Sequence, residues 1–177
     1  MAPNKYAHIE RERRYLVSDP PAEISSATDF LRIVDLYIAG TRLRLRRHED
    51  KNGQVVSRKL GQKFMPQANQ SDATMMTNFY LDESEYKVLS TLTGTSLTKR
   101  RYSHEYSQCR FSIDVFEGAL EGLVLCETEI EETETVAVQL PSFAKREVTS
   151  DQFFTGGSLA RVTSHELAER LRNECRE

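Results

Sequence analysis

Glutamate and arginine alternate near the start of the chain, in a stretch that reads IERERRYLV over residues 9–17. The stretch ends on Tyr-Leu-Val, which favours a β-strand. Side chains two residues apart share one face of a strand, so Glu10, Glu12 and Arg14 are expected to point the same way. Two carboxylates beside a guanidinium suit a divalent cation bound next to an anion. The alternative is a solvated edge strand whose charges compensate one another.

A second pair of alternating glutamates, Glu127 and Glu129, lies far along the chain in residues 122–130, which read GLVLCETEI. The apolar first half of this stretch predicts another strand. One Glu-x-Glu pair is weak evidence for a site. Two of them, on strands so far apart in sequence, indicate that both strands contribute carboxylates to a common site.

Basic residues alternate in the same way in a third stretch, TRLRLRR at residues 41–47. The period of two places Arg42, Arg44 and Arg46 on one face and two leucines on the other. Arginines about 7 Å apart along a strand repel one another, so we expect an anion opposite them. The alternative is an outer face whose arginines lie in water. Later predicted strands carry the further basic residues Lys59, Lys99 and Arg101.

The elements that would position these side chains are mostly strands. The sequence predicts strands at residues 9–17, 33–39, 41–47, 54–60, 73–81, 97–102, 110–116 and 122–130. It predicts helices at 22–31, 83–92, 132–139 and 165–175, the second begun by a capping box of Asp82 and Glu85 and the last capped by Ser164. A helical stripe of Tyr86, Leu89 and Leu92 is expected to be buried, and residues 61–72 are expected to form a loop.

Composition narrows the class of protein. The 177 residues are 38% hydrophobic and 29% charged, which fits a single folded domain over residues 1–177. The net charge of −3 argues against a general nucleic-acid binder, so no DNA partner is expected. No apolar run approaches the roughly 20 residues that cross a bilayer, and the first residues lack the apolar core of a signal peptide. No membrane partner is expected, and the cytoplasm is the expected location.

Other catalytic chemistries lack a signature in this sequence. The cysteines Cys109, Cys126 and Cys175 have no metal-type spacing and are expected to be reduced, with Cys126 buried in a strand. The glycine pair at 156–157 is not followed by Lys-Ser or Lys-Thr, so no P-loop is present. The histidines are scattered, and structural or surface roles are assigned to all four: His8, His48, His104 and His165.

The charged strand faces together favour a polar interior. An outer-face explanation must spread the charges over most of a sheet, whereas a wide barrel would enclose them and pack the apolar alternates outward. The barrel explains the positions of more of the charged residues, and it needs only the assumption of a polar interior. The charged set comprises basic Arg14, Arg42, Arg44, Arg46, Lys59, Lys99 and Arg101, and acidic Glu10, Glu12, Asp114, Glu127 and Glu129.

The ordered set of motifs resembles the CYTH domains, or triphosphate tunnel metalloenzymes. The resemblance covers about residues 8–160 and is carried by Glu10–Arg14, Arg42–Arg46, Lys59, Lys99–Tyr102, Ile113–Gly118, Glu127–Glu129 and Glu147–Thr149. It implies an α+β fold: an eight-stranded antiparallel β-barrel, or tunnel, with helices packed on the outside. It also implies a metal-dependent hydrolase of triphosphate compounds, above all an inorganic triphosphatase, with Mg²⁺ or Mn²⁺ as cofactor.

The resemblance also implies roles for individual residues. The metal would be held by Glu10, Glu12, Asp114, Glu127 and Glu129, with Asp114 a ligand or an organiser. The catalytic groups would be Glu10, Glu12, Lys59, Glu127 and Glu129. Phosphate would be bound by Arg14, Arg42, Arg44, Arg46, Lys59, Lys99 and Arg101. The partner would be a small-molecule triphosphate or polyphosphate whose identity the sequence does not fix, and the oligomeric state, a homodimer included, is equally open.

The chain departs from the family pattern at three places. Arg14 stands where the family has lysine, and because arginine keeps its proton near neutral pH, Arg14 is expected to clamp phosphate and not to donate a proton. Residues 77–81 lack the acidic residues that many relatives carry, so the number of metals is not fixed. Residues 153–157 lack the usual basic and asparagine residues. Two alternatives stay open: a module that binds polyphosphate or a nucleotide without turnover, and a class IV-type adenylate cyclase.

Overall fold

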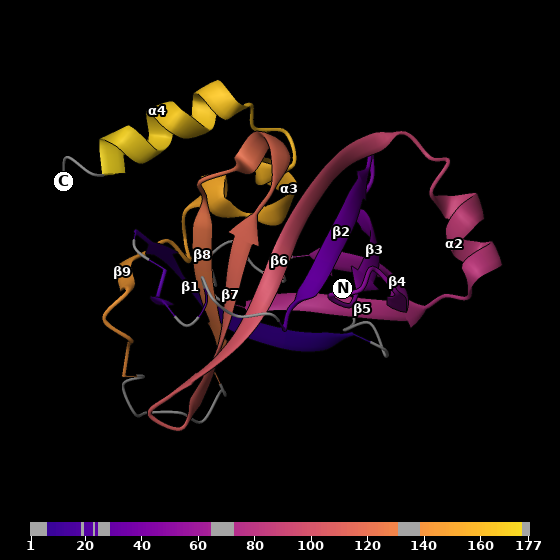
Figure 1. The fold of residues 1–177 in the computed structure, drawn as a ribbon. Helices are drawn as coiled ribbons and strands as arrows, with labels where there is room; N and C mark the ends of the chain where they lie inside the picture. The colour runs from indigo at the N-terminus through magenta and orange to yellow at the C-terminus, as the bar shows by residue number, and fades with distance from the viewer. Residues whose placement is uncertain are drawn as a thin grey trace.

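The computed structural model describes residues 7–18, 20–22, 24, 29–64, 73–130 and 139–174. Its strands form one sheet in the order β5-β4-β3-β2-β6-β7-β8-β1-β9, and β5 also pairs with β1. This last pairing closes eight strands into a barrel and leaves β9 as an addition beside β1 (Figure 1). Every neighbouring pair is antiparallel. The predicted eight-stranded antiparallel barrel is confirmed.

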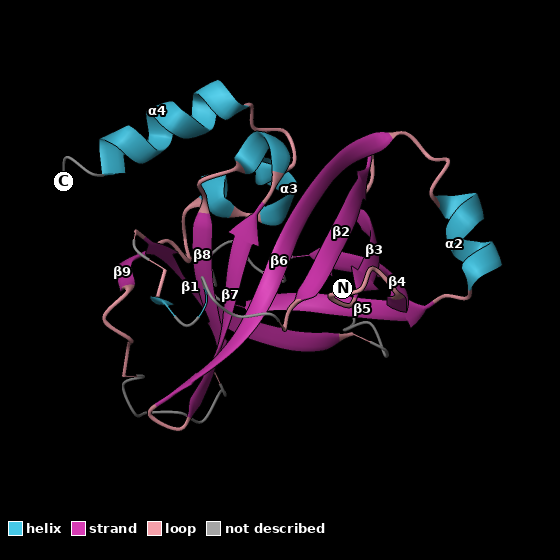
Figure 2. Cartoon of the chain, in the orientation of Figure 1, coloured by secondary structure: helices cyan, strands magenta, loops and turns pink. Residues whose placement is uncertain are grey.

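The strands predicted from the sequence are all present, with shifted bounds. They are β1 (His8–Val17), β2 (Leu31–Ile38), β3 (Leu43–Glu49), β4 (Val55–Phe64), β5 (Ala73–Tyr80), β6 (Gly94–Tyr106), β7 (Cys109–Phe116) and β8 (Val124–Glu129). A further short strand, β9 (Ala144–Glu147), was not predicted. The helices are α2 (Glu83–Leu89), η1 (Gly118–Leu120), η2 (Gln152–Phe154), α3 (Gly156–Leu159) and α4 (Ser164–Glu174), where η marks a 3-10 helix. The α-helices lie outside the barrel, with α3 and α4 at one end and α2 standing apart from them (Figure 2).

Strand β1 closes the barrel because it pairs along both of its edges. One edge pairs with β8 between Glu12 and Leu16. The other edge pairs with β5 over residues 8–11 and with β9 over residues 15–17. Ten residues are enough for two partners on one edge. The charged residues of β1 therefore lie where three other strands meet.

Two tight turns set the register of the hairpins. In the β3–β4 turn, Asp50 Oδ1 accepts a hydrogen bond from the backbone N–H of Asn52 at 2.9 Å, and Gly53 has a φ of 80°. This Asn-Gly pair forms a tight hairpin turn, because glycine adopts a positive φ without strain. In the β6–β7 turn, Ser107 and Gln108 have φ values of 48° and 67°. Two consecutive left-handed residues match the right-handed twist of the strands they join.

The interior of the barrel is apolar toward the end that α3 and α4 cover. Leu16, Leu97 and Leu125 each lie two residues from a charged position of the same strand, so both share one face. These apolar residues form one core cluster with the covering segments: Leu16, Leu97, Phe116, Leu120, Leu123, Leu125, Val148, Phe154, Leu159 and Leu167. A second cluster that contains Tyr15 and Cys126 packs on the opposite face of the strands, and Cys126 is buried as predicted.

The structure corrects the predicted strand bounds at two places. Residues 61–64 continue β4 and are not part of a loop, because their backbone pairs with β5. Strand β3 begins at Leu43, so Arg42 precedes the strand. The ladder with β5 continues through Gly61, which lies opposite Asn78. Residues 65–72 lie outside the described residues.

The structure also corrects two helix predictions. Helix α2 begins with the predicted capping box of Asp82 and Glu85 but ends at Leu89, and none of its residues is buried. Tyr86 and Leu89 are half-buried, and the guanidinium of Arg47 lies 5.8 Å from the centroid of the Tyr86 ring. Leu92 lies beyond the end of α2 and is 44% exposed. Helix α4 is capped by Thr163 and not by Ser164: Thr163 Oγ1 accepts from the N–H of Glu166 at 3.3 Å, and Glu166 accepts from the N–H of Thr163 at 2.8 Å.

Some predictions fall on parts of the chain that the structure does not describe. The predicted helix at 132–139 lies almost entirely outside the described residues, as do half of the helix predicted at 22–31 and all of Cys175. Among the described residues, no helix is long and apolar enough to span a membrane.

Candidate functional site

The charged inner faces of the strands meet in one cavity of about 580 Å³. This volume lies in the usual range of small-molecule sites, about 300–1,000 Å³. Basic side chains outnumber acidic ones in its lining, so the cavity favours an anion. All but one of the predicted site residues line it: Glu10, Glu12, Arg14, Arg42, Arg44, Arg46, Lys59, Lys99, Arg101, Glu127 and Glu129.

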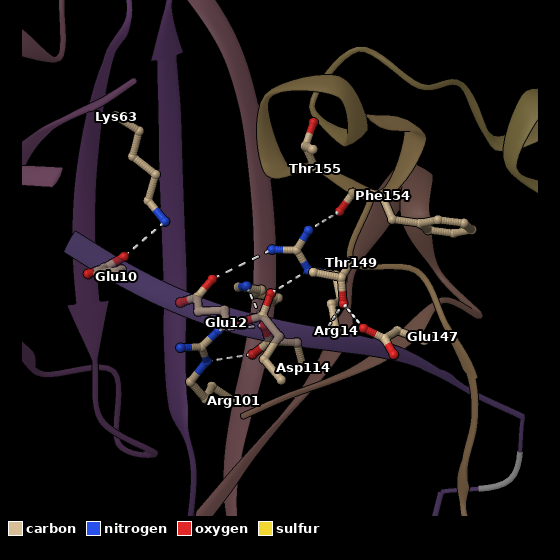
Figure 3. Close-up of polar contacts among 12 residues, drawn as sticks. Glu10, Glu12, Arg14, Lys63, Arg101, Asp114, Glu147, Thr149, Phe154 and Thr155 are labelled. Atoms are coloured by element: carbon tan, nitrogen blue, oxygen red, sulfur yellow. Dashed lines mark hydrogen bonds and ion pairs between the residues drawn. The ribbon is translucent and has the colours of Figure 1, made fainter. Parts of the chain in front are cut away.

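Strands β1 and β8 form the carboxylate wall of the cavity. Glu12 lies opposite Glu129 in the register, and Arg14 lies opposite Glu127. Arg14 Nε donates to Glu127 Oε1 at 2.7 Å, and Arg14 Nη2 lies 3.7 Å from Glu12 Oε2 (Figure 3). Burial, and then the charge of Glu127, raise the pKa of Glu12 above its ordinary value. Glu12 would therefore be stabilised by a further cation.

Arg14 is held from a second side by the segment after β9. Its Nη1 donates to the carbonyl oxygen of Phe154 at 3.1 Å, and its backbone N–H donates to Thr149 Oγ1 at 3.0 Å (Figure 3). Thr149 also donates to Glu147 Oε1 at 2.7 Å. The guanidinium is thus fixed between the carboxylate wall and the loop that covers the apolar end of the barrel.

Asp114 is the predicted site residue that does not line the cavity. Its carboxylate is fully buried and accepts from Arg101 Nε and Nη2, each at 2.6 Å, and from Lys99 Nζ. Arg101 Nη2 also donates to Glu127 Oε2 at 2.6 Å. The structure places Asp114 behind two basic cavity residues, which is the position of an organiser. Its role as a metal ligand stays a prediction.

Asp35 holds the other side of the cavity in the same way, and the sequence analysis did not assign it a role. Arg46 donates to its two oxygens through Nε and Nη2, both at 2.6 Å. Burial alone would raise the pKa of Asp35, but the charges of Arg46 and then Arg44 outweigh it and lower the pKa to about 2. The available signal was a single aspartate in the apolar run IVDLYIA. A charge inside such a run requires a buried partner.

The charges around Glu127 decide its protonation. Burial alone would raise its pKa, but Arg14, Lys99 and Arg101 together hold the pKa well below its ordinary value. Burial also lowers the pKa of Lys99, against the opposing effect of Asp114. Glu127 is therefore an anion at neutral pH, enclosed by three basic side chains.

Lys63 and His48 are cavity residues that the sequence analysis placed elsewhere. Lys63 Nζ lies 3.2 Å from Glu10 Oε2 (Figure 3). It was missed because residues 61–72 were predicted to be a loop. His48 lines the cavity between the phosphate-binding candidates, although structural or surface roles were expected for all histidines. The inner face of β5 offers Met76 and Asn78 but no carboxylate, in line with the departure noted from the sequence.

The described carboxylates of the cavity do not converge on one point as the ligands of a bound metal ion would. In the described parts of the chain, no three acidic, histidine or cysteine side chains converge closely enough to hold a metal ion. Oxygen donors of the kind that Mg²⁺ and Mn²⁺ prefer do line one wall, on β1 and β8. The donor chemistry therefore fits a divalent cation, and the raised pKa of Glu12 is consistent with it.

The structure is similar to several solved structures. It superposes on an inorganic triphosphatase, NE1496, with a TM-score of 0.58 and 22% identity over 86% of this chain and 95% of that one. The fold is that of the triphosphate tunnel proteins. A putative adenylate cyclase from Bacillus halodurans gives a TM-score of 0.52 and 17% identity over 73% of this chain and 84% of that one. The PH1819 protein from Pyrococcus horikoshii gives 0.50 and 16%, over 71% and 80%.

At these identities the likeness shows a shared tunnel fold and no more. Neither the family models nor the curated proteins compared with this chain gave a match. The chemistry of the tunnel must therefore be argued from its own side chains.

Proposed function

We propose that this protein hydrolyses a phosphoanhydride bond of a small triphosphate, inorganic triphosphate above all, with Mg²⁺ or Mn²⁺ as cofactor. The observation that carries the proposal is the cavity itself. Basic side chains from several strands surround a space of small-molecule size, and one wall carries paired glutamates. An anion of high charge and small volume suits this arrangement, and triphosphate is such an anion.

The basic residues would hold the phosphoryl groups. Arginines present two N–H groups in a planar fork that matches the oxygens of phosphate. Arg46 and Arg101 are already fixed by buried aspartates, so little conformational entropy would be lost when the substrate binds. Arg14, Arg42, Arg44, Lys59 and Lys99 would complete the set of phosphate-binding residues.

The carboxylates would hold the cation. Glu10, Glu12, Glu127 and Glu129 are the donors that line the wall, and Asp114 would organise Lys99 and Arg101 from behind. A bound divalent cation would supply charge neutralisation and orientation of the phosphate oxygens. The protein's own part is to place the basic side chains around the terminal phosphoryl group and a carboxylate near the attacking water. The water adds to the terminal phosphorus, and pyrophosphate leaves.

A substrate panel tests the proposal. Inorganic triphosphate, ATP, thiamine triphosphate and long polyphosphate are incubated with Mg²⁺ or Mn²⁺, with chelator as the blank, and phosphate, pyrophosphate and cyclic AMP are measured. We expect phosphate release from triphosphate, lowered about 100-fold or more by Glu127→Gln. The matched control is Glu121→Gln, which changes an exposed glutamate away from the cavity. Absence of turnover with every substrate and both metals would sink the proposal.

A second function is favoured by one observation, and the same panel separates it. The inner face of β5 has Met76 and Asn78 in place of carboxylates, and Arg14 and Arg101 bind Glu127 directly. Such a tunnel could bind polyphosphate or a nucleotide without turnover. Tight triphosphate binding by calorimetry in a protein that releases no phosphate would select the binding module. Cyclic AMP formation from ATP would instead select a cyclase.

A further inference from the structure

The cavity contains an imidazole that the proposed function does not use. His48 lies on the inner face of β3, two residues beyond Arg46, and is half-buried. It lies opposite Ser57 of β4 and opposite Ile33 of β2 in the register. Its Nδ1 is 2.6 Å from Ser57 Oγ. Among the residues that the structure describes, Nε2 has no hydrogen-bond partner, so this nitrogen remains for a ligand in the cavity.

The charges that face His48 come from four strands and are mostly positive. They are Arg46 on β3 itself, Lys59 on β4 and Arg101 on β6, while β2 contributes Asp35. Both oxygens of Asp35 already accept hydrogen bonds from Arg46, through Nε and Nη2. Asp35 therefore does little to offset the positive charges that face His48. Burial, and then Arg46 and Lys59, lower the pKa of His48 to about 4. In the ligand-free cavity the ring is therefore neutral at neutral pH.

We propose that His48 is an anion-binding residue of the cavity and that it takes up a proton as a phosphate anion enters, so that the cavity binds the anion and the proton together. The inference deepens the proposed function, because it rests on that function for the choice of phosphate as the anion. It needs binding only and does not require hydrolysis.

The physical reason is that a bound anion offsets the positive charges that disfavour protonation of the His48 ring. A phosphate group among Arg46, Lys59 and Arg101 cancels the positive field at the ring and supplies oxygen acceptors. A protonated ring can keep its contact with Ser57 through Nδ1 and donate its Nε2–H to a phosphate oxygen. A charge-assisted hydrogen bond of this kind is stronger than a neutral one.

The sign of the pH dependence follows from linkage. The ring binds a proton more tightly in the complex than in the free protein, so binding takes up a proton between the two titration midpoints. Anion affinity is then greatest below this window. It falls as the pH rises through the midpoint of the complex, by up to about tenfold per pH unit.

Histidine resonances in NMR spectra test the inference directly. The wild-type chain is titrated with acid alone, with saturating sulfate and with saturating inorganic triphosphate, and His48→Gln assigns the resonance. Sulfate serves as the probe because it does not titrate near neutral pH. We expect the midpoint of His48 to rise by at least one pH unit with either anion.

Calorimetry in two buffers of different ionisation enthalpy supplies the second measurement. Wild type is expected to take up more protons per bound triphosphate than His48→Gln, by up to one. An unchanged His48 midpoint at the highest anion concentration overturns the inference; the midpoint is measured on the wild-type chain, and the variant serves only to assign the resonance. A shifted midpoint in a protein without turnover would remove the proposed hydrolysis and leave the inference standing. Turnover of triphosphate with an unshifted His48 midpoint would support the proposed hydrolysis and overturn the inference.

Discussion

At the scale of the residue, two buried aspartates fix the arginines that face the cavity. Asp35 binds Arg46 and Asp114 binds Arg101, each through two hydrogen bonds of 2.6 Å. A carboxylate beneath each guanidinium offsets part of the cost of burying it. It also holds the planar group in one orientation before a ligand arrives, which lowers the entropy lost on binding. The cavity is therefore preorganised for an anion, whether or not the anion is hydrolysed.

Asp35→Asn is expected to lower the free energy of unfolding by on the order of 3 kcal/mol at neutral pH, because Arg46 loses its buried partner charge. The folded-state pKa of Asp35 is lowered to about 2 from a reference value of 3.8. Its stabilisation is thus present above the unfolded-state pKa and is lost as the pH falls toward 2. Urea unfolding at neutral pH and at about pH 3 should show the difference between variant and wild type shrinking in acid.

The matched control for this experiment is Asp29→Asn. The Asp29 side chain is 93% exposed and lies 3.7 Å from Lys51 Nζ, so its substitution should change stability by less than about 0.5 kcal/mol. An Asp35→Asn protein that is as stable as wild type at neutral pH would contradict the assignment of Asp35 as an organiser.

At the scale of the element, helix α4 reaches the cavity through the loop after β9. Arg170 donates to Asp151, and its guanidinium lies 5.5 Å and 5.6 Å from the ring centroids of Phe153 and Phe154. The carbonyl of Phe154 in turn accepts from Arg14. A helix outside the barrel is thus connected to a guanidinium inside it. Arg170 therefore lies where it can position Arg14 through the loop, without touching the ligand itself.

Arg170→Ala is expected to weaken triphosphate binding about tenfold, or about 1.4 kcal/mol, because the loop that orients Arg14 loses its charged and aromatic contacts. Calorimetry measures the affinity, and Arg170→Lys should recover part of it. The control is Arg172→Ala on the same helix, whose Nε donates to the carbonyl of Ala168 one turn earlier. Equal affinities for Arg170→Ala and Arg172→Ala would show that the helix does not act on Arg14.

At the scale of the whole molecule, barrel closure gathers more positive than negative charge around one enclosed space. The charges repel one another while the cavity lacks an anion, and an anion relieves the repulsion. Arg44 is an example: its Nε is buried and has no hydrogen-bond partner among the residues described, and it lies 3.9 Å from Asp35, whose two oxygens already accept from Arg46. Anion binding should therefore stabilise the fold as a whole.

Inorganic triphosphate is expected to raise the melting temperature, with a stabilisation of about 2.7 kcal/mol at one hundred times its Kd. Arg44→Gln should reduce the affinity for triphosphate by on the order of 1–2 kcal/mol, because one charged donor is lost. Thermal unfolding at matched ionic strength separates binding from screening. Arg172→Gln serves as the control, and identical triphosphate-induced shifts in both variants would rule out a role for Arg44.

Sequence reasoning was most accurate where the evidence is local. The alternation of charged and apolar residues predicted the strands, and the described residues show that it also predicted which side chains share a face. Sequence reasoning failed where the end of an element, or the burial of a side chain, depends on another part of the fold. Lys63 was assigned to a loop, yet β4 continues to Phe64 because β5 pairs with it. Leu92 was assigned to a buried stripe, yet α2 ends at Leu89, and Leu92 is 44% exposed.

What the sequence by itself determined is the residue types on each strand face, since a strand's period of two is a property of neighbouring residues. What only the tertiary structure decided is the partner of each charge. Arg14 binds Glu127 across 113 positions of sequence, and the two meet because β1 pairs with β8. In the same way, Asp35 lies opposite Arg46 because β2 pairs with β3, and the charge of Lys59 acts on His48 because β3 pairs with β4. Such pairings depend on register and closure, which no local pattern specifies.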